Sequence, residues 1–168
     1  MNIKELEAMI RIVPDFPKAG VSFKDVSPLF EKKFTETVEA LSQLIQWDQV
    51  EQIAGIEARG FILGAALAQK HNKGFIPVRK KGKLPAPTIS KSYELEYGQD
   101  TLEISKLHAP AKTVIVDDVI ATGGTLKATI ELCSEANLEV TNCLALINLS
   151  FLNELDKDHN HIKALFRY

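Results

Sequence analysis

Two adjacent carboxylates and a glycine-rich turn close behind them form the part of this chain with the clearest capacity for chemistry. Asp117 and Asp118 end an apolar run, and Thr122-Gly-Gly-Thr125 opens a segment expected to be helical. Glycine lets the backbone approach an anion closely, and the unpaired amides at a helix start favour a phosphate. The carboxylates repel a phosphate, so they suit hydroxyl groups or an accompanying cation. The stretch predicts a ligand that combines phosphate, sugar hydroxyls and a metal ion.

Two other stretches offer positive charge. Arg59 stands beside Gly60 at an expected helix start, where a guanidinium and free amides would meet an anion. The run Arg79-Lys-Lys-Gly-Lys83 by itself fits a solvated basic loop or a nucleic-acid contact. Its glycine and the prolines that follow favour instead a mobile loop that closes over a charged ligand.

The elements that position these residues alternate between strand and helix. Strands are expected at 21–26, 53–56, 75–78, 93–97, 101–104, 114–116, 140–149 and 162–166, and helices at 3–13, 34–47, 60–71 and 126–136. This alternation predicts an α/β fold with a central, mainly parallel sheet flanked by helices.

Ligands bind such sheets at the carboxyl ends of the strands. The loops 57–60, 79–87 and 117–125 each follow an expected strand, so they should converge on one crevice. A turn is expected at Gly98–Asp100, between two strands. On the alternating pattern alone, Glu103 is expected to face solvent.

Composition limits the class of protein. The 168 residues predict one domain, with 45% hydrophobic and 25% charged residues. A net charge of −2 gives no general attraction to nucleic acid or acidic membranes, and no apolar run approaches a membrane span. Charged residues throughout the first twenty positions argue against a secretion signal. Cys133 and Cys143 lack metal-ligand spacing, so we expect buried thiols in a reducing cytoplasm.

Five stretches, in this order, resemble those of adenine phosphoribosyltransferases, which belong to the type I phosphoribosyltransferases. They are Phe16–Asp25, Gly55–Gly60, Arg79–Thr88, Tyr93–Gly98 and Val116–Thr125, within a similarity that extends from Val13 to Leu149. The Thr-Gly-Gly-Thr turn indicates the type I group, whereas Lys-Leu-Pro-x-Pro-Thr and Leu-Glu-Tyr-Gly indicate the adenine enzymes. The resemblance implies transfer of the phosphoribosyl group of phosphoribosyl pyrophosphate (PRPP) to adenine, giving AMP and pyrophosphate in purine salvage.

The resemblance also assigns roles to residues. Those implied to bind PRPP are Arg59, Arg79, Lys83, Asp117, Asp118, Ala121, Thr122, Gly123, Gly124 and Thr125. Val21, Phe23 and Lys24 would bind adenine, with Phe23 stacked on the base, although an aromatic residue in an apolar stretch is more usually core. Glu96 and Tyr97 would be catalytic residues of a flexible loop.

The same resemblance implies a small hood over the site, formed by residues 1–30 of the single domain 1–168. It implies Mg²⁺ carried by PRPP without direct protein ligands, and a homodimer. The sequence departs from the commoner family pattern at Glu57-Ala58, where Asp-Ser is frequent, and at Lys24, where Arg is frequent.

Two other functions stay open on the sequence alone. A phosphoribosyltransferase for a 6-oxopurine (hypoxanthine, guanine or xanthine) would keep the PRPP site but reverse the hydrogen-bond donors and acceptors of the base pocket. A regulator would bind PRPP without catalysis, although the net charge of −2 offers it no nucleic-acid surface.

Overall fold

The computed structural model describes residues 2–95, 98–155 and 161–168, and the chain divides into two compact units, Met1–Gln43 and Leu44–Tyr168. The first unit contains α1 (Ile3–Glu7), β1 (Arg11–Val13), β2 (Phe23–Asp25), α2 (Ser27–Lys32) and α3 (Phe34–Ser42).

The first unit differs from its expected structure at its start. The helix expected over 3–13 ends at Glu7, because Arg11–Val13 pairs as an antiparallel strand with Phe23–Asp25. The Arg11 guanidinium lies 2.9 Å from an Asp25 carboxylate oxygen across this pair. An apolar spacing typical of a helix was therefore overridden by pairing with a strand further along the chain. The helix α2 was not expected either.

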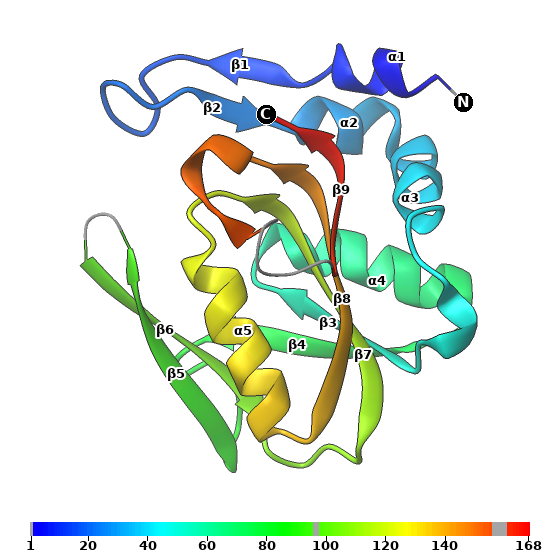
Figure 1. Cartoon of the computed structure of the whole chain (residues 1–168), viewed down its shortest axis with the longest axis vertical. Helices are drawn as coiled ribbons and strands as arrows, with labels where there is room; N and C mark the ends of the chain where they lie inside the picture. Colours follow the sequence, from blue (N-terminus) through cyan, green and yellow to red (C-terminus); the bar gives the residue numbers. More distant parts are fainter. Residues whose placement is uncertain (1, 96–97, 156–160) are drawn as a thin grey trace. The chain divides into compact units, whose positions relative to one another are not determined.

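The second unit is an α/β sheet with helices on both faces (Figure 1). Its elements are η1 (Trp47–Gln49), β3 (Gln52–Ile56), α4 (Arg59–His71), β4 (Gly74–Lys80), β5 (Thr88–Leu95), β6 (Gly98–Ser105), β7 (Ala111–Ile120), α5 (Gly124–Glu135), β8 (Leu138–Asn148), η2 (Ser150–Leu152) and β9 (Ile162–Arg167). Within the described ranges, the strand order is β5-β6-β4-β3-β7-β8-β9. Neighbours from β4 to β9 run parallel, and the hairpin β5–β6 joins β4 antiparallel, so the predicted mainly parallel sheet is confirmed.

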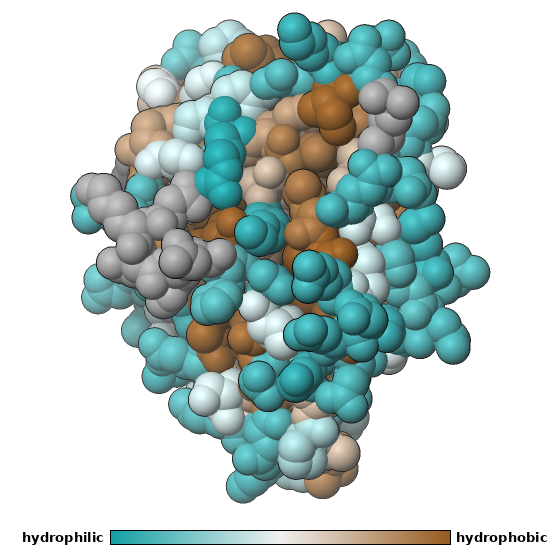
Figure 2. Space-filling view, turned by 45° about the vertical axis from the view of Figure 1, so that its right-hand side comes forward, coloured by the Kyte–Doolittle hydropathy of each residue, from teal (hydrophilic) through white to brown (hydrophobic). Residues whose placement is uncertain are grey.

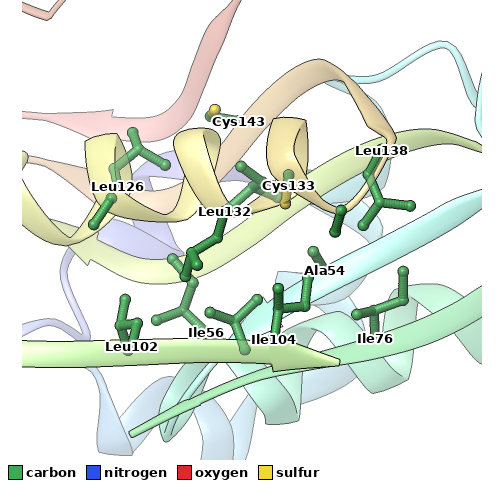
Figure 3. Packing of buried hydrophobic residues seen from close by; sticks show 14 of the residues in the cluster. Ala54, Ile56, Ile76, Leu102, Ile104, Leu126, Leu132, Cys133, Leu138 and Cys143 are labelled. Atoms are coloured by element: carbon green, nitrogen blue, oxygen red, sulfur yellow. The ribbon is translucent and has the colours of Figure 1, made fainter. Parts of the chain in front are cut away.

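Alternate residues of β3 face opposite layers. A Cβ atom placed on Gly64 of α4 would lie 3.5 Å from the Ile53 side chain, so Ile53 faces α4. Ala54 and Ile56 belong instead to the buried cluster that contains Leu132 of α5 (Figure 3). The central strand is covered on both faces, as parallel strands usually are.

Several strands extend beyond their apolar runs. β7 continues to Ile120 and includes both Asp117 and Asp118, because Asp117 pairs with Ala145 and Val119 with Ile147 of β8. Residues 98–100, where a turn was expected, lie in β6, and Gly98 pairs with Leu95. The predicted catalytic pair Glu96 and Tyr97 lies outside the described residues.

One face of the molecule shows how polar and apolar side chains are distributed on its surface. On the face shown in Figure 2, hydrophilic side chains predominate and hydrophobic ones gather in smaller patches. None of the helices that the structure describes is both long and apolar enough to cross a membrane.

Candidate active site

Three neighbouring parallel strands, β4, β3 and β7, bring the predicted site loops to one edge of the sheet. A Cβ atom on Gly60 would lie 2.6 Å from the Val116 carbonyl oxygen and 3.2 Å from Asp117 Oδ1. The Glu57 carboxylate accepts hydrogen bonds from Arg79 Nε at 3.2 Å and from the Lys80 amide at 2.9 Å. The segment from the end of β3 to the first turn of α4 therefore contacts both the acidic pair and the basic stretch, as expected for loops that each follow a parallel strand.

The two carboxylates at the end of β7 have different surroundings. The Asp118 side chain is 8% exposed and forms an ion pair with Arg59. Asp117 Oδ1 accepts a hydrogen bond from the Asp118 amide at 2.8 Å. Burial, followed by the negative charge of Asp118, raises the pKa of Asp117 well above its usual value. A hydroxyl group or cation brought to this pair would relieve that repulsion.

Two helices begin at the same edge. Gly123 precedes α5 with φ +89°, a conformation that favours glycine, and Ala58 precedes α4. As described, neither helix has a side-chain hydrogen bond capping its start. Helix starts of this kind favour an anion, because their first amides lack intrahelical partners and lie at the positive end of the helix dipole. The turn before α5 is held by Asn153, whose Nδ2 donates to the Ala121 carbonyl at 2.7 Å.

The basic stretch forms a turn between β4 and β5. Arg79 belongs to β4, and its Nη1 donates to the Lys83 carbonyl at 3.4 Å. Its guanidinium also lies 5.9 Å from the centre of the Phe61 ring. The amide of Lys80, and then the Arg79 side chain, lower the pKa of Glu57. Arg79 and Lys83, predicted together from the sequence, lie close together, with Arg79 near the end of β4 and Lys83 on the turn that follows.

Two residues of this region were missed or misplaced by the sequence analysis. Glu57 was noted only as a departure from a family pattern, yet it links the loop after β3 to β4. Glu103 was expected to face solvent, and this prediction was wrong: it is 4% exposed. Leu102 and Ile104 beside it are also buried, so β6 is covered on both faces here. A glutamate between two apolar residues of a strand is the usual pattern of a solvent-facing side chain, so no signal in the sequence indicated this burial.

The predicted base-binding residues belong to the first unit, and the predicted PRPP-binding residues to the second. Phe23 lies in β2, and its ring meets that of Phe16 edge-on, with ring centres 5.1 Å apart. Val21 accepts a hydrogen bond from the Phe16 amide at 3.2 Å, and Lys24 pairs with Ile12 of β1. In the ranges described, no group of three or more His, Cys, Asp or Glu side chains is arranged to hold a metal ion.

Comparison with known proteins identifies the architecture. Residues 26–163 match the phosphoribosyl transferase domain family. The adenine phosphoribosyltransferase of Hydrogenovibrio crunogenus is 43% identical over 171 residues, covering 100% of this chain and 99% of the relative. The adenine phosphoribosyltransferase structure from Thermoanaerobacter pseudethanolicus superposes with a TM-score of 0.93 at 42% identity, covering 99% of this chain and 100% of that one.

A yeast relative adds ligands to the comparison. The Saccharomyces cerevisiae adenine phosphoribosyltransferase was crystallised with an imino-altritol bisphosphate and adenine, and it superposes with a TM-score of 0.91 at 34% identity over 97% of each chain. These similarities extend along essentially the whole sequence and include the loops at the carboxyl ends of β3, β4 and β7. The chain therefore belongs to the phosphoribosyltransferase family and, within it, to the adenine phosphoribosyltransferases.

Proposed function

We propose that this protein is a purine-salvage enzyme that transfers the phosphoribosyl group of PRPP to adenine, giving AMP and pyrophosphate. The observation that carries the proposal is the meeting of an acidic pair, two uncapped helix starts and a basic turn at the ends of adjacent parallel strands. PRPP is a ligand with hydroxyls, a monophosphate and a diphosphate, so each of these groups has a counterpart.

The parts of PRPP are assigned by charge. The turn Ala121–Thr125 and the first amides of α5 bind the 5′-phosphate. Asn153 holds this turn in place, and in the described structure no side chain caps the start of α5. Asp117 and Asp118 accept hydrogen bonds from the ribose hydroxyls. Arg59, together with Arg79 and Lys83, binds the pyrophosphate, so Arg59 exchanges its ion pair with Asp118 for one with substrate.

The base is held by the first unit, where Val21 and Lys24 flank Phe23 and the Phe23 ring stacks on adenine. In the reaction, adenine N9 forms a bond to C1 of the ribose, and the bond from C1 to the pyrophosphate oxygen breaks with its electron pair. Glu96 takes the N9 proton, and Tyr97 shares its loop. Holding N9 and C1 in line contributes up to about 7–11 kcal/mol to such a step.

Mg²⁺ is proposed to arrive bound to PRPP rather than in a site built by the chain. The carboxylates of Asp117 and Asp118 fit a ligand that carries a divalent cation, because oxygen donors suit Mg²⁺ and a cation favours the ionised form of Asp117. When bound, Mg²⁺ supplies positive charge to the diphosphate.

A homodimer and a cytoplasmic location complete the proposal. Two-fold dimers are the commonest oligomers among soluble proteins in general. Cys133 and Cys143 are free and buried, and burial raises the pKa of each thiol to about 12, which fits proteins that keep cysteines reduced.

The test is a panel of bases. Purified protein with Mg²⁺ and PRPP is offered adenine, hypoxanthine, guanine and xanthine in turn, and nucleotide formation is followed by chromatography. AMP from adenine alone is the expected result. Product from a 6-oxopurine would reassign the base pocket, and PRPP binding without product from any base would favour a regulator. The dimer is checked by sedimentation of the same preparation.

A further inference from the structure

The turn between β4 and β5 is wrapped around one buried carboxylate. Glu103 Oε1 accepts hydrogen bonds from the Lys83 amide at 2.9 Å and from the Leu84 amide at 2.8 Å. Two consecutive amides of one turn thus converge on a side chain that is 4% exposed.

Such an arrangement stabilises one conformation of the turn. An ionised carboxylate is costly to bury unless hydrogen bonds compensate it. Burial alone would raise the pKa of Glu103, but the amides of Leu84, Gly82 and Lys83 outweigh it, and the pKa is lowered. Gly82 has φ +84°, which turns successive amides toward a single acceptor.

The same turn is held from its other side by Arg79. This arginine is the cross-strand partner of Glu103, donates to the Lys83 carbonyl at 3.4 Å, and is itself bonded to Glu57. The amide of Lys83 is therefore fixed by Glu103 and its carbonyl by Arg79. With both peptide groups fixed, the direction in which the Lys83 side chain leaves the turn is also fixed.

We propose that Glu103 is a positioning residue for PRPP: by binding the Lys83 and Leu84 amides of the turn after β4, it presents Lys83 to the pyrophosphate group. The inference rests on the proposed function, because it concerns the pyrophosphate end of the same substrate. Glu103 does not touch substrate in this scheme and acts through the backbone of the turn.

Two substitutions distinguish the effect of the length of the Glu103 side chain from the effect of its charge. Glu103→Asp keeps the charge but shortens the side chain by one methylene, so the carboxylate no longer reaches the amides. Glu103→Gln loses the charge but keeps an oxygen able to accept from Lys83 and Leu84. We expect Glu103→Asp to raise the KM for PRPP at least about tenfold, because loss of even one hydrogen bond to a charged group implies a change of this size. The KM for adenine should stay within about twofold, and Glu103→Gln should stay closer to wild type than Glu103→Asp.

A matched control is Glu139→Asp, the same change at an exposed position of β8, which should leave every constant unchanged. Thermal unfolding of each variant checks folding. The proposal is overturned if Glu103→Gln is the more impaired variant, or if both KM values rise together in Glu103→Asp.

A measurement on the wild type covers the case in which the variants do not fold. Amide hydrogen exchange should show the Lys83 and Leu84 amides protected in the absence of ligand, and exchange at unprotected rates overturns the proposal. If the wild type forms no nucleotide, the proposed function fails separately. PRPP affinities of the three proteins, measured by calorimetry, then decide the role of Glu103 in their own right.

Discussion

At the scale of single residues, the carboxylates of this site differ in what compensates their charge. Glu57 and Glu103 each accept hydrogen bonds from backbone amides, and their pKa values are lowered. Asp117 accepts one amide bond but stands next to Asp118, and its pKa is raised. Residues of a binding site often carry such uncompensated charge until a ligand arrives, and Asp117 is the residue here that shows it.

Replacement of Asp117 by Asn should increase stability while weakening PRPP binding. The pKa of Asp117 is higher in the folded protein than its value of 3.8 in the unfolded chain. Ionisation of Asp117 therefore lowers the stability of the folded protein as the pH rises from the unfolded pKa to the folded pKa, and this loss persists at neutral pH. Asn keeps the oxygen that accepts from the Asp118 amide. We expect a gain of roughly 1 kcal/mol at pH 7.5 by urea unfolding.

The KM for PRPP of the same variant should rise at least about tenfold, since one carboxylate acceptor is lost. Asp48→Asn, at an exposed position of η1, is the control for stability. A loss of stability in Asp117→Asn would contradict the assignment of repulsion to this pair.

At the scale of elements, the site depends on how closely the start of α4 approaches the end of β7 and how β3 is tied to β4. The first contact is made at Gly60, and the second through Glu57. Glu57 lies in the short connection between β3 and α4, and Gly60 lies in the first turn of α4, so this segment sets the separation between the acidic pair and the basic turn.

The approach of α4 predicts that Gly60→Ala is poorly tolerated. A Cβ atom there would lie 2.6 Å from the Val116 carbonyl oxygen, which belongs to the backbone of a buried strand and cannot move aside. We expect a loss of about 1–3 kcal/mol, seen by urea unfolding, with a raised KM for PRPP. At Gly74 the nearest atom to a new Cβ lies 3.4 Å away on the flexible Gln52 side chain, so Gly74→Ala should have a far smaller effect. Equal effects of the two substitutions would refute the argument from close approach.

The link from β3 to β4 predicts a pH dependence. The pKa of Glu57 is lower in the folded protein than its usual value of 4.5, first through the Lys80 amide. Its stabilising contribution is therefore complete above about pH 4.5 and is lost as the pH falls through the folded pKa. Glu57→Gln should be less stable than wild type by about 1 kcal/mol at pH 7, and this difference should shrink at pH 3. A difference that does not change with pH would show that the charge of Glu57 does not contribute.

At the scale of the whole molecule, the residues proposed to bind the two substrates belong to different compact units. The residues proposed to bind the base lie in Met1–Gln43, and those proposed to bind PRPP lie in Leu44–Tyr168. The division implies that substitutions can affect one substrate without affecting the other.

Phe23→Ala tests this division. Loss of the stacking ring should raise the KM for adenine about tenfold or more, because stacking of a base on an aromatic ring contributes about 1–3 kcal/mol. The KM for PRPP should change little. Phe151→Ala, at a residue that is 69% exposed, is the control. A parallel rise in both KM values would argue against separate binding units.

Local sequence patterns were sufficient for the α/β class, the order of strands and helices in the second unit, and the convergence of the three loops. β3, α4, α5 and β8 were each predicted nearly at their observed positions, because each buries an apolar face whose periodicity is visible in the chain. The placement of Arg59, Asp117 and the Gly123-Gly124 turn at one edge of the sheet was predicted from the rule that the carboxyl ends of parallel strands lie at the same edge.

Three local predictions failed because the outcome depended on a contact with a distant segment. Arg11–Val13 forms a strand only because Phe23–Asp25 pairs with it, β7 extends over two aspartates only because β8 lies beside it, and Glu103 is buried only because the turn after β4 folds over it. A residue that pairs across strands, or that accepts hydrogen bonds from the amides of a separate loop, belongs to no periodic sequence pattern that would indicate these contacts. The residue types of the candidate site can therefore be recognised from the sequence. The contacts that hold its basic turn in place form only when the sheet has formed, because they join residues that are distant in the chain.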